Sequence, residues 1–459
     1  MLTVALWLMP AVASGLPAEV GLDAFETRTW TEADGLPHPQ VNSITQTADG
    51  FLWLATPAGL VRFDGAEMRV FDRSKHPDLI SDHVTAVEAG GNESYLWVGS
   101  RDGGLAHFDG WGFQVYFQPG SPGQPWTVTR LFEDTSGVLW VATQERLLRL
   151  EPGRAALGRG LPGKGVATLY EDHHGYLLVA AGRSLFRRVH SAFSSVNLPL
   201  HAPETPIHAV VMAPDGALLL GRDDGLARLT GSFEKAGLPQ TFEPVPGFED
   251  TRPRLLHRDR DDVLWMVAEG GDLTRLLASG ADALTPMPGG EILSLHEDLE
   301  GTLWLGSSLG LVRLRDPEAG LPQPEPQIDS LEAGLAPMRP RGRLELPPGS
   351  EPITLRFTAA AVNAGGPIRF RHRLEGLDDA WRETGERSVT YASLPAGEYR
   401  FRLQAAYGEG DWGEGAVELS FVRPRALTWL VIVGVAAVLA GLALAVAMVR
   451  RGRMGLSSD

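Results

Sequence analysis

One sequence motif, DGFLWLATPAGLVRFDG at residues 49–65, recurs along most of the chain and constrains the fold more than any other feature. Its tryptophan position is found in seven copies at intervals of 38–46 residues, and these are Trp53, Trp97, Trp140, Leu178, Leu219, Trp265 and Trp304. A leucine follows each position after seven or eight residues. A repeat of about 40–45 residues that reads as several short strands is typical of a propeller blade. The repeat therefore predicts a seven-bladed β-propeller over residues 25–317.

The repeat has a physical reason, because a small isolated sheet cannot bury both of its faces. Blades packed face to face around an axis bury each other, and the large Trp fills the space between them. One turn position needs a positive φ and is held by Gly50, Gly137, Gly175, Gly216 and Gly301, with Ser94 and Asp262 in the other two copies. We also expect residues 25–30 to pair into the last blade and to close the ring.

A basic residue stands two positions after each repeated leucine, on the same face of its strand. These residues are Arg62, His107, Arg149, Arg187, Arg228, Arg275 and Arg313. A binding site would use a few blades rather than all of them, so we expect structural pairing with turn carboxylates. The paired acids Glu133-Asp134, Glu171-Asp172 and Glu297-Asp298 also repeat, and we expect their Asp side chains to cap turns.

Composition excludes several classes of protein. The 459 residues include no cysteine, so disulfides and thiol chemistry are absent. The net charge of −16 argues against nucleic-acid binding, which needs clustered positive charge. Nothing in the sequence indicates a catalytic residue, a metal site or a cofactor, and we expect none.

Two apolar segments predict the location of the chain. Residues 1–18 hold an apolar run and the small residues Ala11-Val12-Ala13, which are typical of an export signal. Residues 426–449 carry no charge over 24 positions, a length of about 36 Å as a helix, and predict one transmembrane α-helix. Three arginines follow within residues 450–459, so we expect a short cytoplasmic tail. Everything before residue 426 is then expected in the periplasm, with the chain a single-pass protein of a bacterial inner membrane.

Between the repeats and this helix lie a Pro- and Gly-rich segment and a group of alternating strands. We expect residues 318–348 to be a linker with little regular structure. Residues 349–424 predict an immunoglobulin- or fibronectin-like β-sandwich. The fold class expected for the whole chain is all-β, followed by the single helix.

The blade formula D-x-x-G-x-LW, then a small residue, then GL-x-RF, resembles the two-component regulator propeller repeat. The stretch TWTEADGLPHPQVNSITQTADGFLWLAT is similar to the first blade of that family. FRHRLEGLDDAWRE and VTYASLPAGEYRFRLQAAYGEGDWGE resemble the Tyr-rich (Y_Y_Y) sandwich that follows such propellers, although Phe370 and His372 stand where the family often has Tyr. The resemblance implies the periplasmic sensor half of a histidine kinase or diguanylate cyclase receptor.

Only ten residues follow the expected helix, so we expect the output kinase or cyclase to be absent from this chain and the sensor itself to be no enzyme. The expected partners are a small polar ligand such as an oligosaccharide, a second copy in a homodimer, and a signalling protein in the membrane or cytoplasm. A small-residue stripe at Ala437, Gly441 and Ala445 is the basis for the dimer. Two other classes stay open: a propeller hydrolase or lyase acting on glycans, and a membrane scaffold for partner proteins.

A ligand has to be recognised where the copies differ, because symmetry fixes the scaffold. We expect the residues just before the first strand of each blade to line one mouth of the central channel. They are His38, Gln40, Asp82, His83, Trp126, Thr127, Lys164, His208, Arg252, Arg254 and Glu291.

Overall fold

The computed structural model describes residues 16, 21–91, 95–117, 127–151, 154–156, 165–172, 174–189, 192–196, 198, 205–231, 240–277, 280–284, 290–334, 336–347, 351–363, 367–413 and 415–424. The chain divides into two compact units. The first runs to Pro322 and includes the short segment Ala361–Ala364, and the second holds Gln323–Ala360 and the residues from Gly365 onward. The expected export signal at residues 1–18 is outside the described residues except for Leu16, which is buried in a core cluster with Leu22 and Phe25. The positions 426–449 of the expected transmembrane helix are outside them too.

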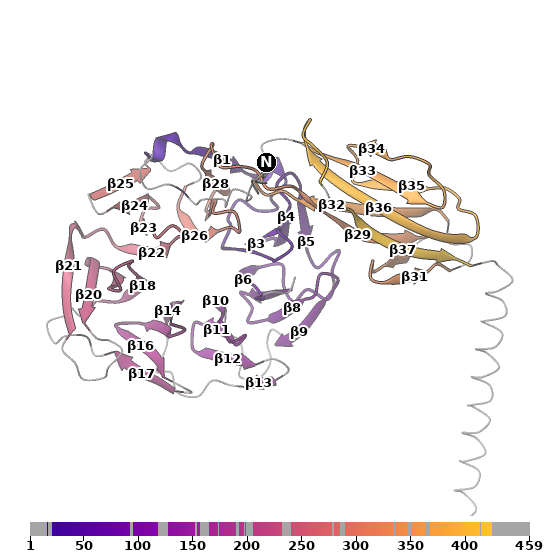
Figure 1. Ribbon diagram of the computed structural model, residues 1–459. Helices are drawn as coiled ribbons and strands as arrows, with labels where there is room; N and C mark the ends of the chain where they lie inside the picture. The colour runs from indigo at the N-terminus through magenta and orange to yellow at the C-terminus, as the bar shows by residue number, and fades with distance from the viewer. Residues whose placement is uncertain are drawn as a thin grey trace, which may run out of the picture. The chain divides into compact units, whose positions relative to one another are not determined.

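The first unit is propeller-like, with small antiparallel sheets placed one after another around a centre (Figure 1). The first three sheets are β2 (Ser43–Gln46), β3 (Leu52–Thr56), β4 (Gly59–Phe63) and β5 (Met68–Phe71); β6 (Val84–Ala89), β7 (Leu96–Ser100), β8 (Leu105–Phe108) and β9 (Phe113–Phe117); and β10 (Val128–Glu133), β11 (Leu139–Thr143), β12 (Leu147–Glu151) and β13 (Arg154–Ala156). In each sheet the strands pair in chain order, so the first strand is innermost.

The next three sheets repeat this order. They are β14 (Val166–Glu171), β15 (Leu177–Ala181), β16 (Ser184–Val189) and β17 (Ala192–Val196); β18 (Ile207–Met212), β19 (Leu218–Arg222), β20 (Gly225–Gly231) and β21 (Gln240–Glu249); and β22 (Pro253–Arg258), β23 (Leu264–Ala268), β24 (Leu273–Leu277) and β25 (Gly280–Leu284). Two short 3-10 helices, η1 (Leu22–Ala24) and η2 (Glu32–Asp34), flank the strand β1 (Glu26–Trp30).

The last sheet of the propeller unit joins the two ends of the repeat region. β26 (Ile292–Glu297), β27 (Leu303–Ser307) and β28 (Leu311–Arg315) take β1 as their fourth, outer strand. Trp30 of β1 lies opposite Leu311, and its ring packs 5.4 Å from that of Trp304. The expected pairing of residues 25–30 into the last sheet is therefore confirmed.

The repeated tryptophan and basic positions of the sequence occupy the same places in every sheet of the propeller unit. The tryptophan position lies on the second strand of each sheet, directly opposite the basic position on the third strand, as in Trp53–Arg62 and Trp265–Arg275. The expected carboxylate pairing of the basic column is found at Arg228, which contacts Asp215. Elsewhere the structure adds aromatic partners: Arg62 lies 4.4 Å from the Phe51 ring and Arg187 lies 4.7 Å from the Tyr176 ring. Cation–π contact is thus a second role of this column.

The turn between the first and second strands needs a left-handed residue. Gly137 and Gly301 have φ values of 77° and 87°, and the aspartate that stands there in the sixth copy, Asp262, also has a positive φ of 66°. The expected turn conformation is confirmed at these positions, and Asp tolerates it because its side chain can bond locally.

The second unit consists of two sheets with a hydrophobic interior. One has the order β30 (Ala336–Met338), β29 (Glu325–Ala333), β32 (Ile353–Ala360) and β35 (Ser388–Tyr391); the other has the order β31 (Arg343–Glu345), β37 (Val417–Arg423), β36 (Gly397–Tyr407), β33 (Ile368–Glu375) and β34 (Arg382–Thr384). Strand β33 alternates between buried and half-buried residues along its whole length, so each second side chain faces the interior. Phe370 and His372 are both on that inner side.

The expectation of little regular structure at residues 318–348 is wrong from residue 325 onward. Residues 325–333 form β29, which pairs with β32, and two further short strands lie at 336–338 and 343–345. The inward residues Leu331 and Ala333 are buried at 0% and 5% exposure. The Pro and Gly residues that suggested a linker lie largely at the strand ends and in the turns, where they do not interrupt pairing.

A tyrosine hydroxyl fixes one corner of the second unit. Tyr399 Oη donates a 2.7 Å hydrogen bond to the carbonyl oxygen of Pro395, four residues earlier. We expect Tyr399→Phe to lower the free energy of unfolding by about 1 kcal/mol, because the ring packing stays and one hydrogen bond is lost. Urea unfolding followed by circular dichroism measures this loss. No change would show that water replaces the bond.

Within the described ranges, no helix is long and apolar enough to cross a bilayer.

Candidate functional site: the central cavity of the propeller unit

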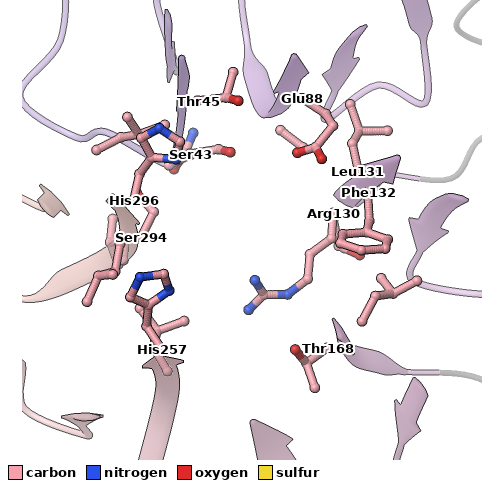
Figure 2. A pocket seen from close by; sticks show the side chains of 18 of the residues that line it. Ser43, Thr45, Glu88, Arg130, Leu131, Phe132, Thr168, His257, Ser294 and His296 are labelled. Carbon is pink, nitrogen blue, oxygen red and sulfur yellow. The ribbon is translucent and has the colours of Figure 1, made fainter. Parts of the chain in front are cut away.

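The innermost strands of the propeller unit surround a cavity of about 480 Å³. Each of the strands β2, β6, β10, β14, β18, β22 and β26 contributes residues to its wall. The wall is apolar where Leu131 and Phe132 stand and polar at several other positions (Figure 2). A concave site of this volume is within the size range of small-molecule sites.

Glu88 of β6 directs its carboxyl group into the cavity (Figure 2). Its Oε1 accepts a 3.2 Å hydrogen bond from the backbone N–H of Glu133. Burial raises the pKa of Glu88 to about 8, and the nearby carboxylate of Glu133 adds to that rise. At neutral pH this side chain is therefore mostly a neutral acid that can donate a hydrogen bond.

Arg130 of β10 extends its guanidinium toward the middle of the same space (Figure 2). Burial lowers the pKa of Arg130 from its ordinary value, but an arginine remains charged at any physiological pH. The hydroxyl of Thr168 on β14 also points into this region. The cavity thus holds a fixed positive charge beside neutral donors and acceptors.

Two histidines complete the polar wall on the opposite side. His257 Nε2 of β22 lies 3.5 Å from Glu297 Oε2 of β26. Burial and the nearby His257 lower the pKa of His296 to about 4, so this imidazole is neutral at pH 7. Its Nε2 is buried and has no hydrogen-bond partner among the described residues.

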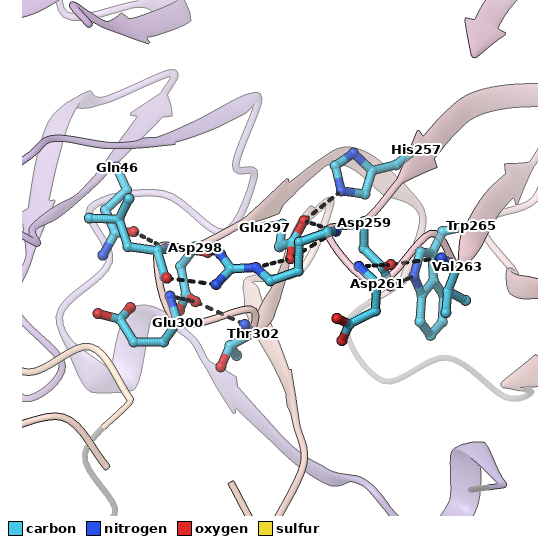
Figure 3. Close-up of polar contacts among 12 residues, drawn as sticks. Gln46, His257, Asp259, Asp261, Val263, Trp265, Glu297, Asp298, Glu300 and Thr302 are labelled. Atoms are coloured by element: carbon cyan, nitrogen blue, oxygen red, sulfur yellow. Dashed lines mark hydrogen bonds and ion pairs between the residues drawn. The ribbon is translucent and has the colours of Figure 1, made fainter. Parts of the chain in front are cut away.

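The rim of the cavity on the turn side is held by repeated hydrogen bonds (Figure 3). Asp259 accepts bonds from Trp265 Nε1 at 2.8 Å and from Val263 N at 2.8 Å, and Asp298 does the same for Trp304 Nε1 at 2.7 Å and Thr302 N at 2.8 Å. The expected turn-capping role is confirmed at Asp298, and Asp134 and Asp172 cap their turns in the same way by accepting from Val138 N and Tyr176 N.

The first acid of each pair has a role that the sequence did not reveal. It accepts hydrogen bonds from the turn of the preceding sheet: Glu297 from Arg260 Nε at 2.7 Å, and Glu171 from Thr135 N at 2.9 Å. Gln46 fills this position in the first sheet and accepts from the backbone N–H of Leu299 at 2.6 Å (Figure 3). These bonds hold neighbouring inner strands together around the cavity.

The described residues of the expected channel mouth lie before or at the starts of the inner strands, and of these described residues Arg254 alone lines the cavity. Several are joined by ion pairs: His208 Nε2 lies 2.8 Å from Asp223 Oδ1, and Arg254 lies 3.3 Å from the same carboxylate. Arg252 and Arg254 both bond Glu269, at 3.2 and 2.8 Å. His38, Gln40, Asp82, His83, Thr127 and Glu291 are partly or fully exposed. Trp126 and Lys164 are outside the described residues, and a ligand role for the set stays a prediction.

The polar residues of the cavity lie at two positions of the inner strand, and the residue type at these positions differs from one copy to the next. Glu88, His257 and His296 lie opposite Trp97, Trp265 and Trp304, and Arg130 and Thr168 stand two positions earlier in the strand. The register shifts after the first residue of most inner strands, as between Val128 and Arg130. This bulge displaces the inward positions along the strand. A charged residue in the middle of an apolar strand was the sequence signal for Glu88 and Arg130.

The pKa of Glu88 predicts a pH effect on stability. An unfolded Glu titrates near 4.5 and the folded one near 8, so between these values the folded state binds more protons and stability falls as pH rises. We expect Glu88→Gln to melt at a higher temperature than the parent at pH 8–9 and to match it more closely at pH 5. Melting scans of both proteins across this range check it, and a constant difference at every pH would contradict it.

Comparisons with known proteins agree with this architecture. Residues 35–58 match the two component regulator propeller family, and residues 363–422 match the Y_Y_Y domain family. Each match is a local one, the first to a single repeat at the start of the propeller unit and the second within the two-sheet unit. No curated protein sequence matches the chain.

Several solved structures share the fold of this chain. An extracellular domain described as part of a hybrid two-component system from B. thetaiotaomicron has a TM-score of 0.51 at 16% identity, covering 87% of this chain and 57% of its own. A second from that organism has a TM-score of 0.50 at 17% identity, covering 86% and 59%. The chain thus spans less than two thirds of these structures. A streptogramin B lyase structure has a TM-score of 0.51 at 15% identity, covering 63% of this chain and 97% of its own.

In the described part of the chain, no cluster of three or more His, Cys, Asp or Glu side chains could hold a metal ion.

Proposed function

We propose that the chain is the ligand-binding sensor region of a bacterial signal-transduction receptor. The propeller closes as seven blades, residues before 426 lie in the periplasm, and residues 426–449 anchor the chain in the inner membrane. The family matches at 35–58 and 363–422 support this proposal. The observation that carries it is the central cavity, whose wall includes Glu88, Arg130 and His257.

A route for the signal follows from the contacts of β26. His296 and Glu297 line the cavity, and the next residue, Asp298, accepts a 2.9 Å hydrogen bond from Asn363 Nδ2. Asn363 belongs to the segment Ala361–Ala364, which lies between β32 and β33 in the sequence but groups with the propeller unit. A ligand that moves β26 would therefore act on a segment connected at both ends to the sandwich. In a homodimer this change would alter the packing of the two membrane helices and reach a signalling partner.

The test is ligand binding by the full chain purified in detergent. We expect one member of a panel of oligosaccharides and small polar metabolites to raise its melting temperature, because a ligand that binds only the folded state stabilises it. A panel that includes neutral and acidic glycans and leaves the melting temperature unchanged throughout would oppose a sensor function.

A lyase or hydrolase is the second candidate, because the cavity holds the titratable side chains Glu88 and His257. Incubation of each stabilising compound with the protein, followed by mass spectrometry, separates the two functions. Recovery of the unchanged compound is expected for a sensor, and cleavage products would establish an enzyme.

A further inference from the structure

The guanidinium of Arg130 is a charge without a counter-charge in the cavity. Burial is the one influence on the pKa of Arg130, with no carboxylate of the described chain acting on it. Its side chain points into the central cavity (Figure 2). Keeping a desolvated charge without a partner is costly, so an anion from outside the chain would stabilise it.

The other charged groups of the wall are already balanced. Glu297 is paired with Arg260 at 2.7 Å and lies 3.5 Å from His257. Arg254 is paired with Glu269 at 2.8 Å and with Asp223 at 3.3 Å. Glu88 is mostly neutral at pH 7 because its pKa is about 8. One positive charge therefore remains, which matches a ligand with a single negative charge.

The remaining wall groups indicate what else the ligand carries. Ser43, Thr45 and Thr168 line the cavity with hydroxyl groups, which can donate and accept hydrogen bonds. The hydroxyls of Ser43 and Thr45 also bond the backbone of β6 at Val87 and Ala89, at 3.4 and 3.2 Å. His296 offers a neutral imidazole whose Nε2 is buried and has no hydrogen-bond partner in the described chain. The planar fork of an arginine fits a carboxylate through two parallel hydrogen bonds. The volume of about 480 Å³ falls in the range of small-molecule sites.

We propose that the central cavity binds a small organic monoanion, a carboxylate that also carries hydroxyl groups, and that Arg130 binds its carboxylate. This inference rests on the proposed sensor function and names the chemical class of its ligand. A sugar acid and a free hydroxy acid share this chemistry.

The experiment is calorimetric titration of the full chain in detergent at fixed ionic strength. The probes are glucuronate, galacturonate, gluconate and lactate, with glucose and galactose as the matched neutral sugars. We expect at least one acid to bind and its neutral counterpart to bind far more weakly. Tighter binding of the hexuronates than of gluconate and lactate would identify the ligand as a cyclic sugar acid. The reverse order would identify it as an open-chain hydroxy acid.

Two variants test the role of the guanidinium. Arg130→Gln is expected to lower the affinity for the acid about 10- to 100-fold, because a charge-assisted bond is lost. Arg73→Gln removes the same charge from an exposed position in the same unit and should leave the affinity unchanged. Without ligand, Arg130→Gln should melt at the same or a higher temperature than the parent, because an unpaired charge is removed. A structural role for Arg130 would instead lower the melting temperature.

The proposal is overturned if none of the four acids binds the parent protein, or if Arg130→Gln binds the acid as well as Arg73→Gln does. Binding of a neutral oligosaccharide in either of these cases would leave the sensor function intact and remove only the anionic ligand class. If neither the acids nor the neutral glycans bind, both the sensor function and the anionic ligand class are contradicted.

Discussion

Trp304→Ala is expected to lower the free energy of unfolding of the propeller unit by about 3–5 kcal/mol. The side chain of Trp304 is fully buried at 0% exposure. Its ring packs 5.4 Å from that of Trp30 and 5.9 Å from that of Phe63, so the substitution opens a cavity where β1 closes the last sheet. The buried carboxylate of Asp298 also loses a 2.7 Å bond from the indole N–H.

The matched control is Trp111→Ala, because Trp111 is 38% exposed. It should change the free energy of unfolding by no more than about 0.5 kcal/mol. Urea unfolding followed by circular dichroism near 215 nm measures both variants without relying on tryptophan fluorescence. Equal effects of the two substitutions would contradict the role assigned to the repeated tryptophan column.

Asp298→Ala is expected to lower the free energy of unfolding by about 3–5 kcal/mol, since it leaves several buried donors without an acceptor. These donors are Trp304 Nε1 at 2.7 Å, Thr302 N at 2.8 Å and Asn363 Nδ2 at 2.9 Å. Asp298→Asn keeps one oxygen acceptor and should cost less. Because Asp298 also holds Asn363, we expect faster amide hydrogen exchange in residues 361–363 of the alanine variant.

Asp261→Ala is the control for this prediction. Asp261 is exposed in the equivalent turn of the preceding sheet, where Asp259 is the buried cap. We expect a change within about 0.5 kcal/mol, measured by the same urea titration. If Asp298→Ala proves as mild as this control, the hydrogen-bonded turn contributes little to stability and the proposed link to Asn363 loses its basis.

The repeated features of the fold could be predicted from the sequence, and the features that break the repeat could not. Seven copies of the Trp, Leu and basic columns indicate the sheets, and residues 25–30 pair with β28 as expected. Strand β29 was mistaken for a linker because Pro324, Pro326 and Gly334 lie at or near its ends. Its pairing with β32 is a tertiary contact that composition does not report.

The sequence predicted that the ligand site lies where the copies differ, but it did not identify most of the residues that line the cavity. The argument that a ligand is recognised where the copies differ also applies to Glu88 and Arg130. The bulge near the start of the inner strands changes which residues face the centre, and a bulge leaves little trace in a single sequence. The pairing of His208 and Arg254 through Asp223 likewise depends on the approach of two neighbouring sheets.

The most direct test of a sensor propeller is hydrogen exchange of the full chain with and without the compound that raises its melting temperature most. Binding in the cavity predicts slower exchange in β6, β10, β22 and β26, and a change in residues 361–363 that follows from the Asp298–Asn363 bond. Protection confined to the outer strands of the propeller unit, with the inner strands unaltered, would contradict a ligand site at its centre.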